Sequence, residues 1–175
     1  MRIASTFAVL AAAFLPALGI AKPKSPVADA FRDNKERMEK NLIAAAEEMP
    51  ADKYGYKPTP AQMTFGEVVL HVAKDNDIAC PPIAGKTAPD RAPLTASDDK
   101  DKLVARLRDT FAFCDESVAK LDDSDLGGQV SAFGYTWTRV GLMNERMEDW
   151  ADHYSQFAIY LRLNNLLPPT AKPRS

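Results

Sequence analysis

The sequence predicts an all-α protein folded as a four-helix bundle. Four long segments carry apolar residues at intervals of three and four, the spacing that gathers them on one side of a helix. Segments rich in proline and glycine separate the four, and no strand-like alternation competes with the helical pattern. Hydrophobic residues make up 46% of the 175 residues, enough to fill the core of one domain.

Residues 1–21 are predicted to be a secretory signal peptide that takes no part in the fold. Arg2 gives a positive start, residues 7–15 form an apolar run shorter than the roughly 20 residues that cross a bilayer, and small residues lead to a cleavage point after Ala21. No later segment approaches that length, so we expect no membrane contact after the signal is removed. Residues 22–175 then form a single domain of a periplasmic or secreted protein.

The first helix is predicted over residues 26–49. Ser25 suits the N-cap position, and Pro26 suits the first helical position because its missing N–H group would have no partner there. The apolar residues of this segment share one stripe: Val27, Phe31, Met38, Leu42, Ala45 and Met49. Residues 50–63 contain three prolines and a glycine and are predicted to form a loop.

The second helix is predicted to start at Thr64. Thr64 and Glu67 have the spacing of a capping box, in which each side chain bonds the backbone N–H group of the other residue. The apolar face of this helix comprises Phe65, Val68, Val69, Val72, Ala79 and Ile83. Pro81 and Pro82 cannot donate helical hydrogen bonds, so they predict a kink or an end close to Cys80.

The third and fourth helices are predicted over residues 98–121 and 138–164. The stripe of the third comprises Val104, Leu107, Phe111, Cys114, Val118 and Leu121. The stripe of the fourth comprises Met143, Met147, Trp150, Tyr154, Phe157 and Leu161. The loops at residues 85–97 and 122–137 are longer than simple bundle connections, so at least one is expected to cross the end of the bundle. The second of them contains three glycines and leaves room for a short extended piece.

Cys80 and Cys114 are the two cysteines of the chain, and they allow two interpretations. They can be buried thiols that pack as small hydrophobic groups. They can also form a disulfide that joins two helices, since an exported protein folds where disulfides persist. Spacing in the sequence does not decide between these interpretations, because it does not give the distance between the two Cα atoms.

The charge pattern argues against nucleic-acid binding. The formal net charge is −2, and positive and negative residues alternate without a block of Lys and Arg. The sequence also lacks a Gly-x-Ser-x-Gly nucleophile elbow, a glycine-rich phosphate loop and a zinc-type cysteine pair. We therefore expect no nucleic-acid partner and no cofactor other than a metal ion.

The two histidines of the chain, His71 and His153, are the candidate metal ligands. Each lies beside the apolar stripe of its helix, so both are expected at the edge of a groove between the second and fourth helices. Asp149 is four residues before His153 and projects from the same side. Two imidazoles and a carboxylate can hold a divalent ion, such as Zn, Ni, Mn or Fe, and leave a position open. The alternative is that Asp149 and His153 form an ordinary surface pair.

Seven short segments carry a resemblance to a known family: residues 54–60, 64–73, 80–85, 113–115, 153–156, 160–164 and 168–169. Together they resemble the DinB-like superfamily of four-helix metalloproteins. The resemblance covers nearly the whole mature chain, and it depends on the order and spacing of the segments more than on any one of them.

That resemblance implies an up-down-down-up bundle and frequent dimerisation, so a homodimer is expected. It also implies three metal-binding histidines, one on the second helix and an H-x-x-x-H pair on the last. His71 and His153 match the first and third positions. Asp149 stands at the middle position, where the family usually has histidine. Aspartate is shorter than histidine, so this departure puts the placement and the strength of metal binding in question.

Three functions are compatible with the sequence. The first is a metal-dependent enzyme of hydrolase or transferase type that acts on a small molecule through an ion held by His71, Asp149 and His153. The second is a non-catalytic exported binding or interaction protein with a degenerate metal site. The third places both histidines at the surface and assigns function to the loops. The sequence identifies neither a substrate nor a catalytic residue, and it leaves open whether the protein is an enzyme.

Overall fold

Residues 25–173 are described by the computed structural model, and within them four α-helices form the body of the protein. They are α1 (Pro26–Glu48), α2 (Phe65–Ala84), α3 (Lys100–Val118) and α4 (Arg139–Leu163). The all-α architecture predicted from the sequence is confirmed. The signal peptide predicted for residues 1–21 lies outside the described residues. In the described part of the chain, no helix is both long and apolar enough to cross a membrane.

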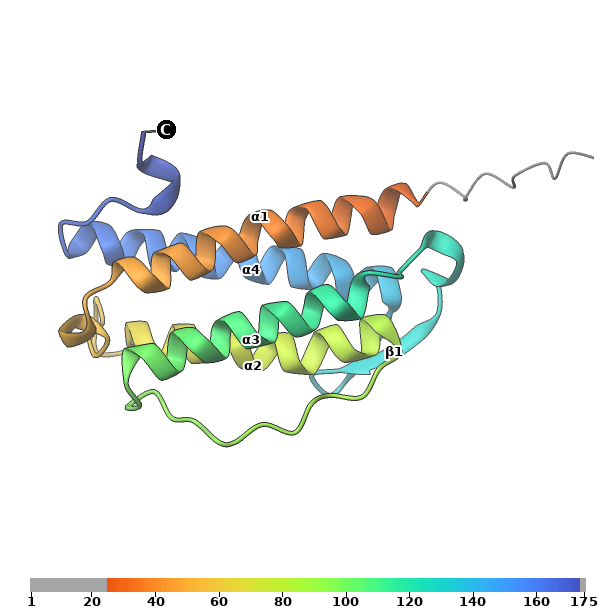
Figure 1. Cartoon of the computed structure of the whole chain (residues 1–175), viewed down its shortest axis with the longest axis horizontal. Coiled ribbons are helices and arrows are strands. Elements are labelled where there is room, and N and C mark those ends of the chain that lie inside the picture. Colours follow the sequence, from red (N-terminus) through yellow and green to blue (C-terminus); the bar gives the residue numbers. More distant parts are fainter. Residues whose placement is uncertain (1–24, 174–175) are drawn as a thin grey trace, which may run out of the picture.

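The four helices run in an up-down-down-up order. Figure 1 shows α2 and α3 running in the same direction, with α1 and α4 running in the opposite direction. A constant sequence offset confirms that α2 and α3 are parallel: Asn76 bonds Thr110, and Cys80 bonds Cys114, both across 34 residues. Two successive helices that run in the same direction need a long connecting segment. Residues 85–99 form this segment and run along the outside of α2 and α3.

The two cysteines form a disulfide between the C-terminal parts of α2 and α3. The Cα atoms of Cys80 and Cys114 lie 5.3 Å apart, and both side chains are fully buried. The disulfide interpretation is therefore confirmed, and the interpretation as two free thiols is wrong. A crosslink that closes a loop of this length stabilises a fold by about 3–4 kcal/mol, chiefly by restricting the unfolded chain.

The end of α2 differs from the prediction made from its prolines. The helix continues through Pro81 and Pro82 to Ala84, four residues beyond the expected end. Gly85 then adopts a left-handed conformation with φ of 64°, and its N–H group bonds the carbonyl of Pro82 at 3.2 Å. The guanidinium of Arg139 also donates to that carbonyl, at 3.2 Å. The two prolines supply no N–H group to the carbonyls of residues 77 and 78, four positions earlier, and they do not end the helix. Gly85 and Arg139 cap the helix at its last turn.

A two-stranded hairpin occupies most of the glycine-rich segment before α4. Strands β1 (Gln129–Ala132) and β2 (Tyr135–Thr138) pair in antiparallel fashion. Phe133 and Gly134 make the turn with φ of 54° and 76°, the positive values that a tight two-residue hairpin turn requires. The sequence allowed an extended piece here but did not predict paired strands. The hairpin contacts both α2 and α4 at one end of the bundle (Figure 1).

The N-terminus of α1 is capped by a residue distant in the sequence. Ser25 occupies the N-cap position, but its side chain makes no capping hydrogen bond, so that part of the prediction is wrong. The carboxylate of Asp123 accepts instead from the backbone N–H groups of Val27 and Ala28, at 3.1 and 2.9 Å. Val27, assigned to the apolar stripe by its spacing, is exposed at this end. The capping box of Thr64 and Glu67 on α2 is confirmed in both directions.

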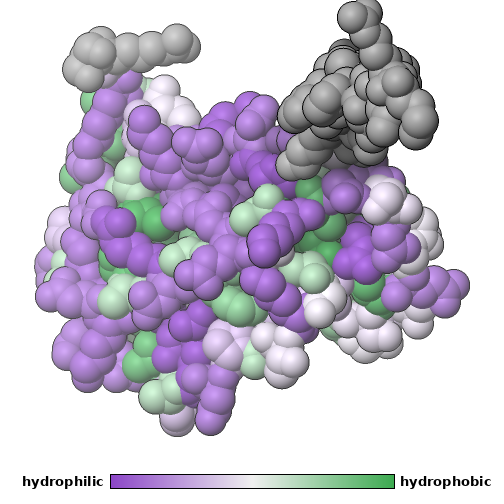
Figure 2. Space-filling model, turned by 45° about the vertical axis from the view of Figure 1, so that its right-hand side comes forward, coloured by the Kyte–Doolittle hydropathy of each residue, from purple (hydrophilic) through white to green (hydrophobic). Residues whose placement is uncertain are grey.

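All four helices contribute to one hydrophobic core. Its large buried side chains include Phe31 from α1, Phe65 from α2, Phe111 from α3 and Trp150 from α4. Helix α3 is shorter than predicted at both ends, and Leu121 lies beyond it, half-buried. The surface seen in Figure 2 is mostly hydrophilic, with hydrophobic residues in small separate groups. Most of the apolar residues that the sequence assigns to the helical stripes are buried in this core.

Replacing both cysteines, in a Cys80→Ser, Cys114→Ser double variant, should lower the free energy of unfolding by about 2–4 kcal/mol. Urea denaturation of the oxidised protein measures this loss. Wild-type protein unfolded under a reducing agent serves as the matched control and should show a similar loss. Two titratable thiols in denatured, unreduced wild-type protein would contradict the disulfide.

An Asp123→Ala variant should lose about 1 kcal/mol of stability, because two N–H groups at the start of α1 lose their acceptor. The control is Asp33→Ala, which removes an exposed acid from the same helix. Thermal or urea denaturation compares the two variants. Equal stabilities would show that the Asp123 cap contributes nothing.

Candidate metal centre

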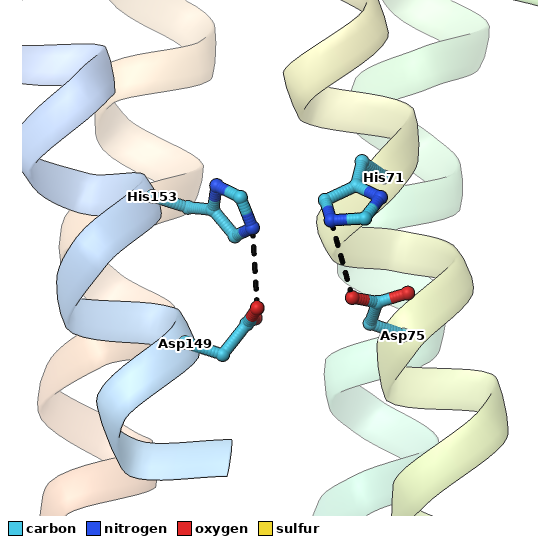
Figure 3. Close-up of side chains that lie close together, drawn as sticks. All are labelled: His71, Asp75, Asp149 and His153. Carbon is cyan, nitrogen blue, oxygen red and sulfur yellow. Dashed lines mark ion pairs between the residues drawn. The ribbon is translucent and has the colours of Figure 1, made fainter. Parts of the chain in front are cut away.

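Four side chains from two helices converge at one point of the bundle. His71 and Asp75 come from α2, and Asp149 and His153 come from α4. One potential ligand atom from each residue lies within 4.8 Å of those of the other three. Figure 3 shows the two pairs facing each other across the gap between the helices. The structure therefore brings together the three residues selected from the sequence and adds Asp75.

The antiparallel packing of α2 and α4 explains this convergence. On α2 the histidine precedes the aspartate by four residues, and on α4 the aspartate precedes the histidine by four. Because the helices run in opposite directions, histidine faces histidine and aspartate faces aspartate (Figure 3). The two imidazole rings meet edge to face with centroids 4.8 Å apart. Within each helix, Nε2 lies near a carboxylate oxygen, 3.3 Å for His71–Asp75 and 3.2 Å for His153–Asp149.

The centre is closed on the α4 side and open on the α2 side. The side chain of His153 is 6% exposed, whereas that of His71 is 42% exposed. The expectation that both histidines line an accessible edge holds for His71 and is wrong for His153. The buried face of α4 is rotated toward Arg146 and His153, while Met147 and Tyr154 are only half-buried. Burial of His153 also excludes the interpretation in which both histidines lie at the surface.

Arg146 is a second residue of the centre that no pattern in the sequence indicated. Its side chain is fully buried, and its Nη2 atom lies 2.5 Å from Asp149 Oδ2 and 3.9 Å from Asp75 Oδ2. Its Nε atom donates to Glu145 at 3.3 Å. One signal for Asp75 was present, since it repeats on α2 the four-residue spacing found on α4. For Arg146 no comparable signal existed, because a charged helix residue is usually solvated.

The carboxylates and histidine of the centre have shifted pKa values. Burial raises the pKa of Asp75, and it also raises the pKa of Glu145. Burial would raise the pKa of Asp149 too, but the hydrogen bond from His153 and the charge of Arg146 outweigh it and lower the pKa. Burial would lower the pKa of His153, but its bond to Asp149 prevails and raises the pKa. Asp149 is therefore held in the ionised form in which it can bind a cation.

A buried polar network fixes the helices beside the centre. The indole Nε1 of Trp150 donates to Asn76 Oδ1 at 2.8 Å, and Asn76 Nδ2 donates to Thr110 Oγ1 at 3.3 Å. Asn76 directly follows Asp75, and Trp150 directly follows Asp149. The bond between them therefore sets the position of α2 relative to α4 at the level of the two aspartates.

The residues present fit a divalent transition metal. With neutral histidines, the three carboxylates of Asp75, Asp149 and Glu145 exceed the single positive charge of Arg146, so a dication would balance the centre. Imidazole nitrogens with carboxylate oxygens are donors that suit zinc, iron, manganese and nickel. Four buried polar atoms of the centre make no hydrogen bond within the described part of the chain: His153 Nδ1, both Nη atoms of Arg146 and Asp149 Oδ2. The contact of Arg146 Nη2 with Asp149 Oδ2 is an ion pair without hydrogen-bond geometry. This arrangement suggests a divalent metal and does not determine which one.

The fold and the centre define the protein as a four-helix-bundle protein with a candidate His/Asp metal site. The family model of the DinB superfamily matches residues 35–156. The chain therefore belongs to the DinB superfamily, as its sequence motifs indicated.

Solved structures show the same fold at low sequence identity. A DinB-like protein of Bacillus subtilis is 20% identical with a TM-score of 0.62, over 86% of this chain and 99% of that one. A DinB-like protein of Bacillus cereus is 15% identical with a TM-score of 0.65, over 81% and 95%. A conserved protein of Enterococcus faecalis is 14% identical with a TM-score of 0.63, over 78% and 96%. No curated protein matches the chain significantly.

An Asn76→Leu variant should lose about 1–3 kcal/mol of stability, because the buried Trp150 N–H group is left without an acceptor. Adding Trp150→Phe removes that unsatisfied donor, so the double variant should lose less than the sum of the two single losses. Urea denaturation of the four proteins gives this coupling energy. Strictly additive losses would show that the two side chains are not coupled.

Proposed function

We propose that the protein is a divalent-metal-dependent enzyme of hydrolase or transferase type. The observation that carries the proposal is the convergence of His71, Asp75, Asp149 and His153 to within 4.8 Å of one another. The ion would be held by the two imidazoles and the two carboxylates. When bound, such an ion supplies Lewis acidity, which polarises a substrate or acidifies water.

The surroundings of the centre favour a small-molecule substrate that approaches from the side of His71. A groove of about 430 Å³ reaches this residue between α2 and the returning loop. Its lining combines apolar and polar groups: Met63, Glu67, Leu70, Lys74, Leu94 and Thr95. On the opposite side, His153 and Trp150 are buried. The chain would thus orient a substrate from one direction only.

We also propose that the protein acts in the periplasm or outside the cell. The supporting observation is the buried disulfide between Cys80 and Cys114. Structural disulfides persist in oxidising compartments and are rare in the cytosol. This agrees with the signal peptide expected from residues 1–21.

A second candidate function is a binding or interaction protein that holds no metal. The observation in its favour is Arg146, whose guanidinium lies 2.5 Å from the Asp149 carboxylate and already compensates part of the charge. In that case the four side chains would be a buried ion-pair cluster that stabilises the contact of α2 with α4. Metal content separates the two candidates.

Elemental analysis of untagged, mature protein should find about one transition-metal ion per chain. His153→Ala and Asp75→Ala should each lose most of the ion, because each removes one ligand, while their helicity by circular dichroism stays near that of the wild type. Asp152→Ala is the matched control, since it removes an exposed acid next to His153 and should keep the ion.

Two results would contradict parts of the proposal. A wild-type protein that contains no metal and takes none up from micromolar Zn, Ni, Mn or Fe would refute the enzyme and favour the binding protein. Retention of the ion by Asp75→Ala alone would reduce the ligand set to His71, Asp149 and His153.

A further inference from the structure

We propose that Arg146 is a positioning residue that makes Asp149 bind the metal through one oxygen, Oδ1, and so keeps a coordination position open. This inference rests on the proposed metal centre and deepens it. The geometry that motivates it is the different environment of the two carboxylate oxygens of Asp149.

The two oxygens of Asp149 point to different partners. Its Oδ1 atom lies 3.2 Å from Nε2 of His153, another potential ligand residue. Its Oδ2 atom lies 2.5 Å from Nη2 of Arg146. A carboxylate can bind an ion through one or both oxygens, but the positive charge of a guanidinium held beside one oxygen repels a second cation from that oxygen. Oδ1 would then be the oxygen that binds the metal.

Burial and contacts with two aromatic rings confine Arg146 to this position. Its side chain is fully buried, and its guanidinium carbon lies 5.6 Å from the centroid of the Phe133 ring and 5.9 Å from that of Trp150. Its Nε atom is bonded to Glu145. A guanidinium is planar, rigid and always charged, so its charge and direction are both fixed here.

The hairpin supports this arrangement through a strained residue. Phe133 has a φ of 54°, a left-handed conformation that is rare for a bulky side chain. In this conformation Phe133 turns the hairpin and lies against the guanidinium of Arg146. The bound position of Arg146 is thus maintained by two elements, α4 and the β1–β2 turn.

Binding of Asp149 through a single oxygen would affect how many coordination positions of the ion remain free. Two imidazoles and two carboxylates that each bind through one oxygen supply four donor atoms. An ion that prefers five or six donors then keeps room for water or for a substrate atom. A second oxygen from Asp149 would fill one of these places. Arg146 would therefore keep one coordination position of the ion open without binding the ion itself.

Binding of imidazole, a neutral ligand, to the Co²⁺-loaded protein tests the inference in solution. The wild type should bind imidazole with a change in its visible spectrum, and Arg146→Gln should bind it about tenfold more weakly because Asp149 Oδ2 takes the open position. Imidazole carries no net charge, so loss of the Arg146 charge does not by itself weaken it. Arg162→Gln, which changes an exposed arginine of the same helix, is the control and should match the wild type.

Several outcomes decide between the inference and the proposed function. Equal imidazole affinity in the wild type and Arg146→Gln, or no imidazole binding by the Co²⁺-loaded wild type, overturns the role of Arg146 alone. No Co²⁺ binding by the wild type refutes the metal centre itself. If Arg146→Gln does not fold, a crystal structure of the Zn²⁺-loaded wild type decides: Asp149 bound through Oδ1 with Oδ2 on Arg146 supports the inference, and chelation by both oxygens overturns it.

Discussion

The antiparallel packing of α2 against α4 is the constraint on which the candidate metal centre depends. Each helix carries a histidine and an aspartate one turn apart, and opposite directions bring like groups to the same level. The bond from Trp150 to Asn76 fixes that level, since each residue directly follows one of the aspartates. The disulfide joins α2 to α3, so α2 is fixed relative to α3 as well as to α4. The centre is therefore a property of the helix packing and not of a loop.

Charge burial gives the centre its chemical character. Three carboxylates that are mostly buried lie around the fully buried guanidinium of Arg146, and uncompensated charge in such a place is costly. Arg146 offsets one negative charge from a fixed direction, and a divalent ion would offset the remaining two. The same low exposure that raises the pKa of Asp75 also strengthens any ionic interaction formed at the site. The half-exposed His71 leaves one direction from which a ligand can reach it.

Much of the fold could be predicted because its signals are local. The bounds of α1 and α4 agree with their apolar spacing to within one residue, and the capping box at Thr64 is present as expected. The predictions for the ends of helices were wrong where a residue distant in the sequence contacts the end of the helix. Asp123 caps α1 in place of Ser25, and Arg139 bonds the carbonyl of Pro82 in the last turn of α2, which continues past its prolines. Neither contact is visible in the sequence, because each joins residues more than fifty positions apart.

The helical architecture, the family and three of the four converging side chains could be predicted from the amino-acid sequence. Helical periodicity and short motifs carry this information because they involve residues within a few turns of each other. The disulfide, the burial of His153, and the presence of Asp75 and Arg146 in the centre became evident only from the packing of the helices. A polar residue on a helix is the same in sequence whether it faces water or a second helix. Its role is fixed only when the neighbouring helix is placed against it.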